Sequence, residues 1–554
     1  MKKAIETFGR KEREIPDAAS LLNHEGAPTF RRNLEEQVIQ VLTTNTLSRT
    51  FYVSRGEITR ETLEVLIEMR DKDPEFLAKA LVYARNHGFM QFVPLVGLAI
   101  LSTARDKDPF RLAFPKVVQT PDNLLEFVAL CRSGKIRKGL GGVAPEATKT
   151  WLGGLTAYHA IKYSGASEGI SLRDVLRMAH PKPTDDVLRE RFGWLVKGWD
   201  GIGEEPSPTN PQIWYYERLK RATDEATILE SIAEGRLPWE VVVPAVRKMT
   251  TPIWEALMRQ MPYMALLRNL NTLTRAGVFA KPGNVEYAAG RLSDSRAVAK
   301  AKILPFRFFE AYKAYAADPA HEPKIAEALE AALESSFANM PDLLGTVAIG
   351  SDVSGSMSRL VSEKGHTRYI DVCGVYTASL VKKSADRVVV LPFEFDVVKG
   401  IRINRGDSVF TIADRLASIS GGGTAVGAPV QFLLDRKITV DTFIGITDQE
   451  DWCYDRPGFY GRGVRGSFLD LWRQYRAEVA PDARAFLLTI ASYRDAVAPQ
   501  NEPGVHFIYG WSPDVPRYIA SQLNAGKGQV DAVEAIQLTD TGEEPQYLKA
   551  ASAS

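Results

Sequence analysis

Apolar residues recur at helical spacing over the first part of the chain. From residue 33 to about 341 one helical pattern follows another, as in Leu34, Val38 and Leu42, and strand patterns are almost absent. Pairs of these predicted helices are separated by Asp-Pro, Pro or Gly breaks, for example at Asp73. We therefore predict an α-solenoid, in which each pair of helices buries its apolar face against the next pair. No fixed sequence period accompanies the pattern.

After Pro341 the pattern changes to alternating strands and helices. Apolar runs of strand character, spaced by amphipathic helices, predict a parallel sheet covered by helices on both faces, a doubly wound α/β domain. Ligands bind such sheets at the carboxyl ends of the strands. The predicted strands are Thr346–Ser351, Arg387–Pro392, Val440–Ile446, Ala485–Ile490 and Val505–Tyr509, and the predicted helices include Arg368–Ser384, Ser408–Ile419 and Ser467–Glu478.

Oxygen-bearing side chains follow two of the predicted strands. Asp352, Ser354 and Ser356 form the pattern D-x-S-x-S directly after the first strand, Thr424 follows a glycine run, and Asp448 follows another apolar strand. A hard divalent cation prefers oxygen ligands, and Mg²⁺ keeps several of its waters. These residues therefore predict a divalent cation site, with Mg²⁺ favoured and Mn²⁺ possible. The alternative is that Ser354 and Ser356 lie in a plain turn that caps the next helix.

The same five residues resemble the metal-ion-dependent adhesion site of a von Willebrand factor A domain. The resemblance implies that Ser354 and Ser356 bind the ion directly and that Thr424 binds it directly or through water. Asp352 and Asp448 would act largely through water or as hydrogen-bond acceptors.

Several segments of the helical part resemble the TROVE module of the Ro autoantigen family, which has bacterial members. The family combines a ring of HEAT-like helical repeats with a von Willebrand factor A domain, in the order expected here, and the resemblance covers roughly residues 25 to 535. It implies an arm at 1–28, a TROVE domain at 29–341, an A domain at 342–536 and a tail at 537–554. The segments that carry it are Phe92–Ala99, Leu172–Pro183, Met261–Leu270 and Ile303–Arg307.

This resemblance implies an RNA-binding scaffold. Such proteins bind small noncoding Y RNAs on the outer surface of the ring, and single-stranded ends of misfolded or maturing RNA enter its hole. In bacteria an exoribonuclease would be the expected partner, polynucleotide phosphorylase being the one known for the family. We expect a monomeric ring.

Basic side chains on loops and helix ends are the candidates for RNA contacts, because phosphate contacts dominate affinity. Lys135, Arg137 and Lys138 lie between Gly134 and Gly139, where backbone and side chains could approach a phosphate. An ordinary solvated loop between helices is the alternative.

A second candidate group lies around the predicted helix that starts at Leu172. His180 matches a family position linked to Y RNA binding, although a histidine at a helix end is also a common structural cap. Arg173 and Arg177 share one helix face, with Lys182 just beyond. The segment before this helix is basic and aromatic in the family, but here only Lys162 remains as a cation.

Arg268 is the last candidate for an RNA contact. It lies on a predicted helix otherwise built of apolar residues such as Leu267 and Leu270. It could pair with a buried carboxylate or face a phosphate in the lumen of the ring, and we favour the lumen.

Composition limits the class of protein. Apolar residues make up 45% and charged residues 25% of the 554 residues, and the formal net charge is +1, as in ordinary globular proteins. The three cysteines form no C-x-x-C pair, and neither a secretory signal nor a run of eighteen apolar residues occurs. We expect a cytoplasmic protein without a membrane anchor.

Two motifs of hydrolytic enzymes are absent from the sequence. Neither H-E-x-x-H nor the phosphate-binding loop occurs, and we expect a non-enzyme. The alternative to an RNA-binding scaffold is a protein-interaction subunit whose A domain binds a partner carboxylate through the metal ion.

Overall fold

The computed structural model of the protein describes residues 21–22, 28–29, 33–43, 60–87, 90–134, 136–165, 169–201, 205, 207–361, 367–419, 421–448, 464–490, 502, 504–509, 515, 519 and 529–539. Near the N-terminus, β1 (Leu21–Leu22) and β2 (Pro28–Thr29) form a short antiparallel pair.

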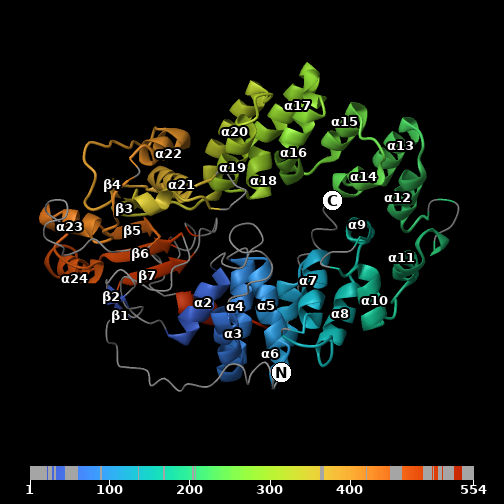
Figure 1. The fold of residues 1–554 in the computed structure, drawn as a ribbon, viewed down its shortest axis with the longest axis horizontal. Helices are drawn as coiled ribbons and strands as arrows, with labels where there is room; N and C mark the ends of the chain where they lie inside the picture. The colour runs from blue at the N-terminus through green and yellow to red at the C-terminus, as the bar shows by residue number, and fades with distance from the viewer. Residues whose placement is uncertain are drawn as a thin grey trace.

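The first part of the chain is a curved row of helices, as predicted (Figure 1). Consecutive helices pack against one another, for example α4 against α5 and α6, and α19 against α20. The helices are α2 (Leu34–Thr43), α3 (Arg60–Lys72), α4 (Pro74–Asn86), α5 (Phe92–Leu101), α6 (Asp108–Val117), α7 (Pro121–Arg132), α8 (Ala144–Leu152), α9 (Ala157–Lys162), α10 (Leu172–Ala179), α11 (Asp186–Lys197), α12 (Pro211–Arg221), α13 (Glu225–Gly235), α14 (Trp239–Ala245), α15 (Thr251–Gln260), α16 (Tyr263–Arg275), α17 (Pro282–Ser293), α18 (Ser295–Ala301), α19 (Pro305–Ala316) and α20 (Pro323–Ser336). Short 3-10 turns occur at η2 (Gly198–Gly201), η3 (Val278–Ala280) and η4 (Phe337–Asn339).

The breaks that the sequence indicated are helix starts. The carboxylate of Asp73 accepts a hydrogen bond from the Phe76 amide of α4, and the hydroxyl of Thr120 accepts one from the Asn123 amide of α7. In both helices a proline occupies the first turn, where its missing N–H leaves no hydrogen bond unmade.

The second part of the chain is a five-stranded parallel sheet in the order β4-β3-β5-β6-β7, which confirms the predicted α/β class. Each observed strand begins and ends within two residues of the predicted one. The elements are β3 (Val347–Asp352), η5 (Gly355–Ser358), α21 (Tyr369–Lys383), β4 (Val388–Phe393), α22 (Val409–Ala417), α23 (Ala428–Asp435), β5 (Thr442–Thr447), α24 (Phe468–Glu478), β6 (Arg484–Thr489), β7 (Val505–Tyr509) and α26 (Gln529–Glu534).

Alternate strand residues face two different helical layers. Ile349 and Ile444 belong to one core with α21 and α22, whereas Ala348 and Phe443 belong to another core with α23 and α24. The first of these cores continues without interruption into the helical part of the chain. The sheet is therefore covered on both faces, and one of its cores is shared with the helical row.

The row of helices and the sheet domain together form a closed ring (Figure 1). At one junction α19 packs against α21, and the ring of Phe410 on α22 lies 5.2 Å from that of Phe309 and 4.3 Å from that of Tyr312. At the other, α26 packs against α2 and α4, and β7 contacts α2. The side chain of Val533 on α26 is fully buried there.

One buried carboxylate joins the first of these junctions. Asp371 on α21 accepts hydrogen bonds from Lys313 on α19 at 2.9 Å and from Arg368 at the start of its own helix at 3.1 Å. Burial alone would raise the pKa of Asp371, but these hydrogen bonds outweigh it and hold the pKa below its ordinary value. The ionised carboxylate therefore stabilises the folded ring.

We expect Asp371→Asn to lower the free energy of unfolding by about 2 kcal/mol at pH 7, because hydrogen bonds to a charged group are lost. Because the pKa is lower in the folded than in the unfolded state, the carboxylate contributes fully above the unfolded value of about 4 and progressively less below it. The difference between variant and wild type should therefore shrink as the pH falls from 5 toward 2, measured by urea denaturation.

The control for this comparison is Glu327→Gln, which removes an exposed carboxylate on α20. It should leave the free energy of unfolding close to that of the wild type both at pH 5 and near pH 2. A difference between Asp371→Asn and wild type that grows on acidification would contradict the assignment.

Candidate functional site

The five predicted metal-ligand residues meet at one edge of the sheet. Asp352 is the last residue of β3, and Asp448 directly follows the neighbouring strand β5. Both carboxylates are fully buried. Since parallel strands end at the same edge, the strand pairing alone brings these two distant positions together.

The loop after β3 is fixed by the carboxylate that precedes it. Asp352 accepts a hydrogen bond from the Ser354 amide at 2.9 Å, and its other oxygen accepts one from the Thr447 hydroxyl at 2.7 Å. The hydroxyl oxygens of Ser354 and Ser356 lie 3.1 Å apart. The turn η5 begins at Gly355, so the alternative reading of these serines as part of a turn also describes the backbone correctly.

The glycine run before Thr424 forms the opposite side of this loop. The Gly355 amide donates a hydrogen bond to the Gly422 carbonyl at 3.1 Å. Gly422 has a φ of +70°, and a Cβ there would collide with the carboxylate of Glu394. Because Gly422 has no side chain, its backbone can pack closely against Glu394, and the nearby Thr424 is buried.

The electrostatics of this edge favour a cation. Burial, together with the nearby charge of Asp448, raises the pKa of Asp352 well above the ordinary value of an aspartate. The Arg359 guanidinium donates to Asp448 at 3.2 Å, so one positive charge already lies against the pair. Two buried carboxylates beside two hydroxyls form an oxygen donor set that suits a hard divalent cation. The residues present therefore fit such an ion, with Ser354 and Ser356 as the hydroxyl donors.

Three residues at this edge were missed by sequence reasoning. Thr447 could have been noticed as a polar residue that ends an apolar strand. Arg359 and Glu394 carry no comparable signal, because they reach the site only through the folded loops. Among the described residues, no group of three or more His, Cys, Asp or Glu side chains is arranged so that it could hold a metal ion.

The predicted RNA-contact residues fall into two groups in the structure. Arg137 donates to the Ser102 hydroxyl at 2.6 Å and to the Gly141 carbonyl, and it therefore holds its own loop together. Lys162 forms an ion pair of 2.8 Å with Glu240. These two side chains are engaged within the fold.

The other group is exposed to solvent. The side chains of Lys138, Arg177, Lys182 and Arg268 are exposed and form no ion pair within the described part of the chain, although Asp174 interacts electrostatically with Arg177. Arg268 therefore lacks the buried carboxylate considered above. Arg173 is also exposed, and its Nε donates to the Leu195 carbonyl at 2.9 Å. Lys135 lies outside the described residues.

His180 ends α10 in a left-handed conformation with a φ of 51°. Its amide donates to the Leu176 carbonyl at 2.9 Å and thereby caps the helix, while its side chain remains exposed. The backbone thus confirms the reading of this histidine as a helix cap, and its contact with RNA stays a prediction. It lies on the same exposed end of α10 as Arg177.

A helical ring closed by a parallel α/β domain with a D-x-S-x-S loop defines a class of protein, helical repeats joined to a von Willebrand factor A domain. Within it, the sequence matches the TROVE domain over residues 237–322 and the Ro60 vWA domain over residues 346–522. These two matches support the assignment of the chain to the Ro family.

Relatives and a solved structure agree with this assignment. RNA-binding protein RO60 of Deinococcus radiodurans is 28% identical over 486 residues, covering 81% of this chain and 87% of the relative. RNA-binding protein RO60 of Caenorhabditis elegans is 25% identical over 470 residues, covering 73% of this chain and 71% of the relative. The crystal structure of the Deinococcus radiodurans RO (RSR) protein superimposes with a TM-score of 0.69 at 20% identity, covering 89% of this chain and all of that one, and supports the fold.

Proposed function

We propose that the protein is an RNA-binding scaffold of the Ro type. It binds a small Y-like noncoding RNA on the outer surface of the ring and the single-stranded ends of structured or defective RNA in the ring hole. It presents these RNAs to an exoribonuclease and performs no chemistry itself. The assignment to the Ro family and the two relatives named RNA-binding protein RO60 support the proposal. No helix in the described part of the chain is long and apolar enough to span a membrane.

The observation that carries the proposal is the exposed end of α10. Arg177 and Lys182 are exposed there beside the exposed imidazole of His180, and neither forms an ion pair within the described residues, although Asp174 lies near enough to Arg177 to interact with it electrostatically. On the next helix, by contrast, Arg189 is paired with Asp186. Unpaired cations at a helix end are free to exchange their counterions for the phosphates of a nucleic acid, which provides most of the affinity in such complexes.

We also propose that the edge of the sheet binds Mg²⁺ through the D-x-S-x-S loop. When bound, the ion would offer a coordination position to a carboxylate of a partner. This gives a second candidate function, a metal-dependent protein-interaction subunit, which the two buried carboxylates Asp352 and Asp448 favour independently of any RNA.

The first test is to crosslink the protein in its native cells and to sequence the RNA recovered with it. The double variant Arg177→Gln, Lys182→Gln should bind the recovered RNA more weakly than the wild type does. The slope of log affinity against log salt should also become shallower by about 2, one unit for each lost phosphate contact. Filter binding between 50 and 300 mM KCl measures both quantities.

The control is Arg189→Gln, which removes one exposed cation that is already paired with Asp186. It should leave the salt slope nearly unchanged. If the double variant keeps the wild-type slope, the end of α10 makes no phosphate contact. If no RNA is recovered and a protein partner is lost in EDTA, the metal-dependent interaction subunit replaces the RNA scaffold.

The metal site predicts that Mg²⁺ stabilises the protein. At a concentration 100 times the dissociation constant, the stabilisation should be about 2.7 kcal/mol, which appears as a rise in the melting temperature. Asp448→Asn should abolish most of this rise, because it removes one of the two carboxylates. Asp482→Asn, at an exposed position of the same domain, should show the full rise. An equal rise in all three proteins would place any bound ion elsewhere.

A further inference from the structure

A pocket opens between α10 and α11. Its volume is about 330 Å³, and its walls are the apolar side chains of Leu176, Pro181, Phe192 and Val196, together with Arg177 and His180. Val196 is 36% exposed and is one of few large apolar side chains exposed in the described part of the chain. The pocket is thus a hollow with an aromatic and aliphatic floor that is open to solvent.

Exposed cations accompany this pocket. Arg177 lines it and forms no ion pair among the described residues, although Asp174 lies near enough to interact with it electrostatically. Lys197, which follows Val196 on α11, is exposed and has no acidic partner among the described residues. An apolar hollow accompanied by exposed cations fits a ligand that combines a flat apolar group with negative charge. A nucleotide has both, in its base and its phosphate.

The chain continues from the pocket directly to a second flat surface. Trp199 follows Val196 by three positions, across the turn at Gly198, which has a φ of +67°. The guanidinium of Arg221 on α12 lies 4.1 Å from the centroid of a Trp199 ring. An arginine stacked on an indole offers the outer face of its flat guanidinium as a surface on which a base can stack.

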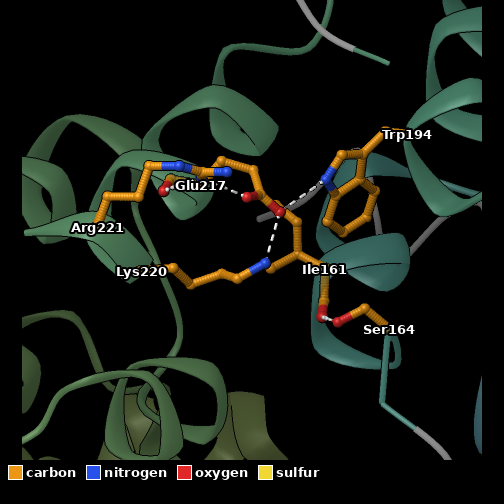
Figure 2. A network of polar contacts seen from close by, with 6 residues as sticks. All are labelled: Ile161, Ser164, Trp194, Glu217, Lys220 and Arg221. Carbon is orange, nitrogen blue, oxygen red and sulfur yellow. Dashed lines mark hydrogen bonds and ion pairs between the residues drawn. The ribbon is translucent and has the colours of Figure 1, made fainter. Parts of the chain in front are cut away.

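A buried carboxylate fixes this second surface (Figure 2). Glu217 is only 2% exposed and accepts hydrogen bonds from Arg221 at 2.7 Å, Lys220 at 2.7 Å and the Trp194 indole at 3.0 Å. Burial would raise the pKa of Glu217, but these three donors together hold it below its ordinary value, so the carboxylate stays ionised.

This anchoring leaves positive charge at the surface. One carboxylate holds two cations, Lys220 and Arg221, whose side chains remain 43% and 48% exposed. Both cations are thus held in place before any ligand arrives, which lowers the conformational entropy lost on binding.

We propose that the pocket between α10 and α11 and the stacked pair of Trp199 and Arg221 together bind a single-stranded stretch of nucleic acid. One base enters the pocket and a neighbouring base stacks on the Trp199–Arg221 pair. Arg177, Lys197 and Lys220 contact the phosphates. The inference rests on the proposed RNA-binding function and adds to it that this surface requires unpaired bases, which a duplex does not expose.

The test compares two fluorescein-labelled probes on the full chain, a ten-nucleotide oligouridylate and an abasic ribose-phosphate strand of the same length. Wild type should bind the oligouridylate about tenfold more tightly, because stacking contributes per base. Trp199→Ala should reduce this preference about fivefold and leave the affinity for the abasic strand nearly unchanged. Val196→Gln should act in the same way by placing a polar side chain in the apolar mouth of the pocket. Fluorescence anisotropy gives each affinity.

Arg189→Gln on α11 is the matched control and should keep the full preference. Thermal unfolding of each variant checks that the fold is intact. The proposal is overturned if wild type binds both probes equally, if both variants keep the preference, or if they lose affinity equally for both probes. The recovery of RNA from cells tests the proposed function separately, since a protein that binds cellular RNA but shows no preference for bases contradicts only this inference.

Discussion

The whole ring depends on each helix burying its apolar face against a neighbour. A row of helices that ended freely would expose an apolar face at each end, and open repeat proteins need polar caps there. In this chain the sheet domain covers both ends, through α21 and α22 at one junction and α26 at the other. One continuous core consequently runs from Val38 on α2 to Leu538 beyond α26. The ring needs no caps because it has no ends.

The two candidate surfaces of the molecule have opposite electrostatic designs. At the edge of the sheet, two buried carboxylates lie beside the guanidinium of Arg359, and we propose that a cation binds there. On α12, a single buried carboxylate holds two cations, and we propose that an anion binds there. In both places a buried acid determines the sign of the surface above it. The two sites differ in the sign of their excess charge, and not in the number of their charged residues.

Much of the architecture could be predicted from the sequence, because it follows local rules. The strands are continuous apolar runs, and the helix starts at Asp73 and Thr120 carry their own caps. The proximity of Asp352 and Asp448 could be inferred from the sequence, since both follow strands that were predicted to be parallel.

Contacts between distant residues could not be predicted in this way. No sequence pattern near Arg137 indicates its hydrogen bond to Ser102, and none near Lys162 indicates its ion pair with Glu240. Counting cations therefore overestimated how many of them are available to a ligand. The same limit applies to the closure of the ring, which depends on the packing of α26 on α2 and α4.

This closure has a consequence for the order in which the protein can fold. The ribosome makes α2 and α4 early, but α26, which covers them, is made only after the entire sheet domain. Until α26 is made, the apolar surface of α2 and α4 that Val533 helps to cover is exposed to water or to a chaperone. A nascent chain can build its helical pairs one after another, but it can complete the circle only after the strands of the sheet domain and α26 have been made. Ring closure therefore requires that synthesis has passed the sheet domain.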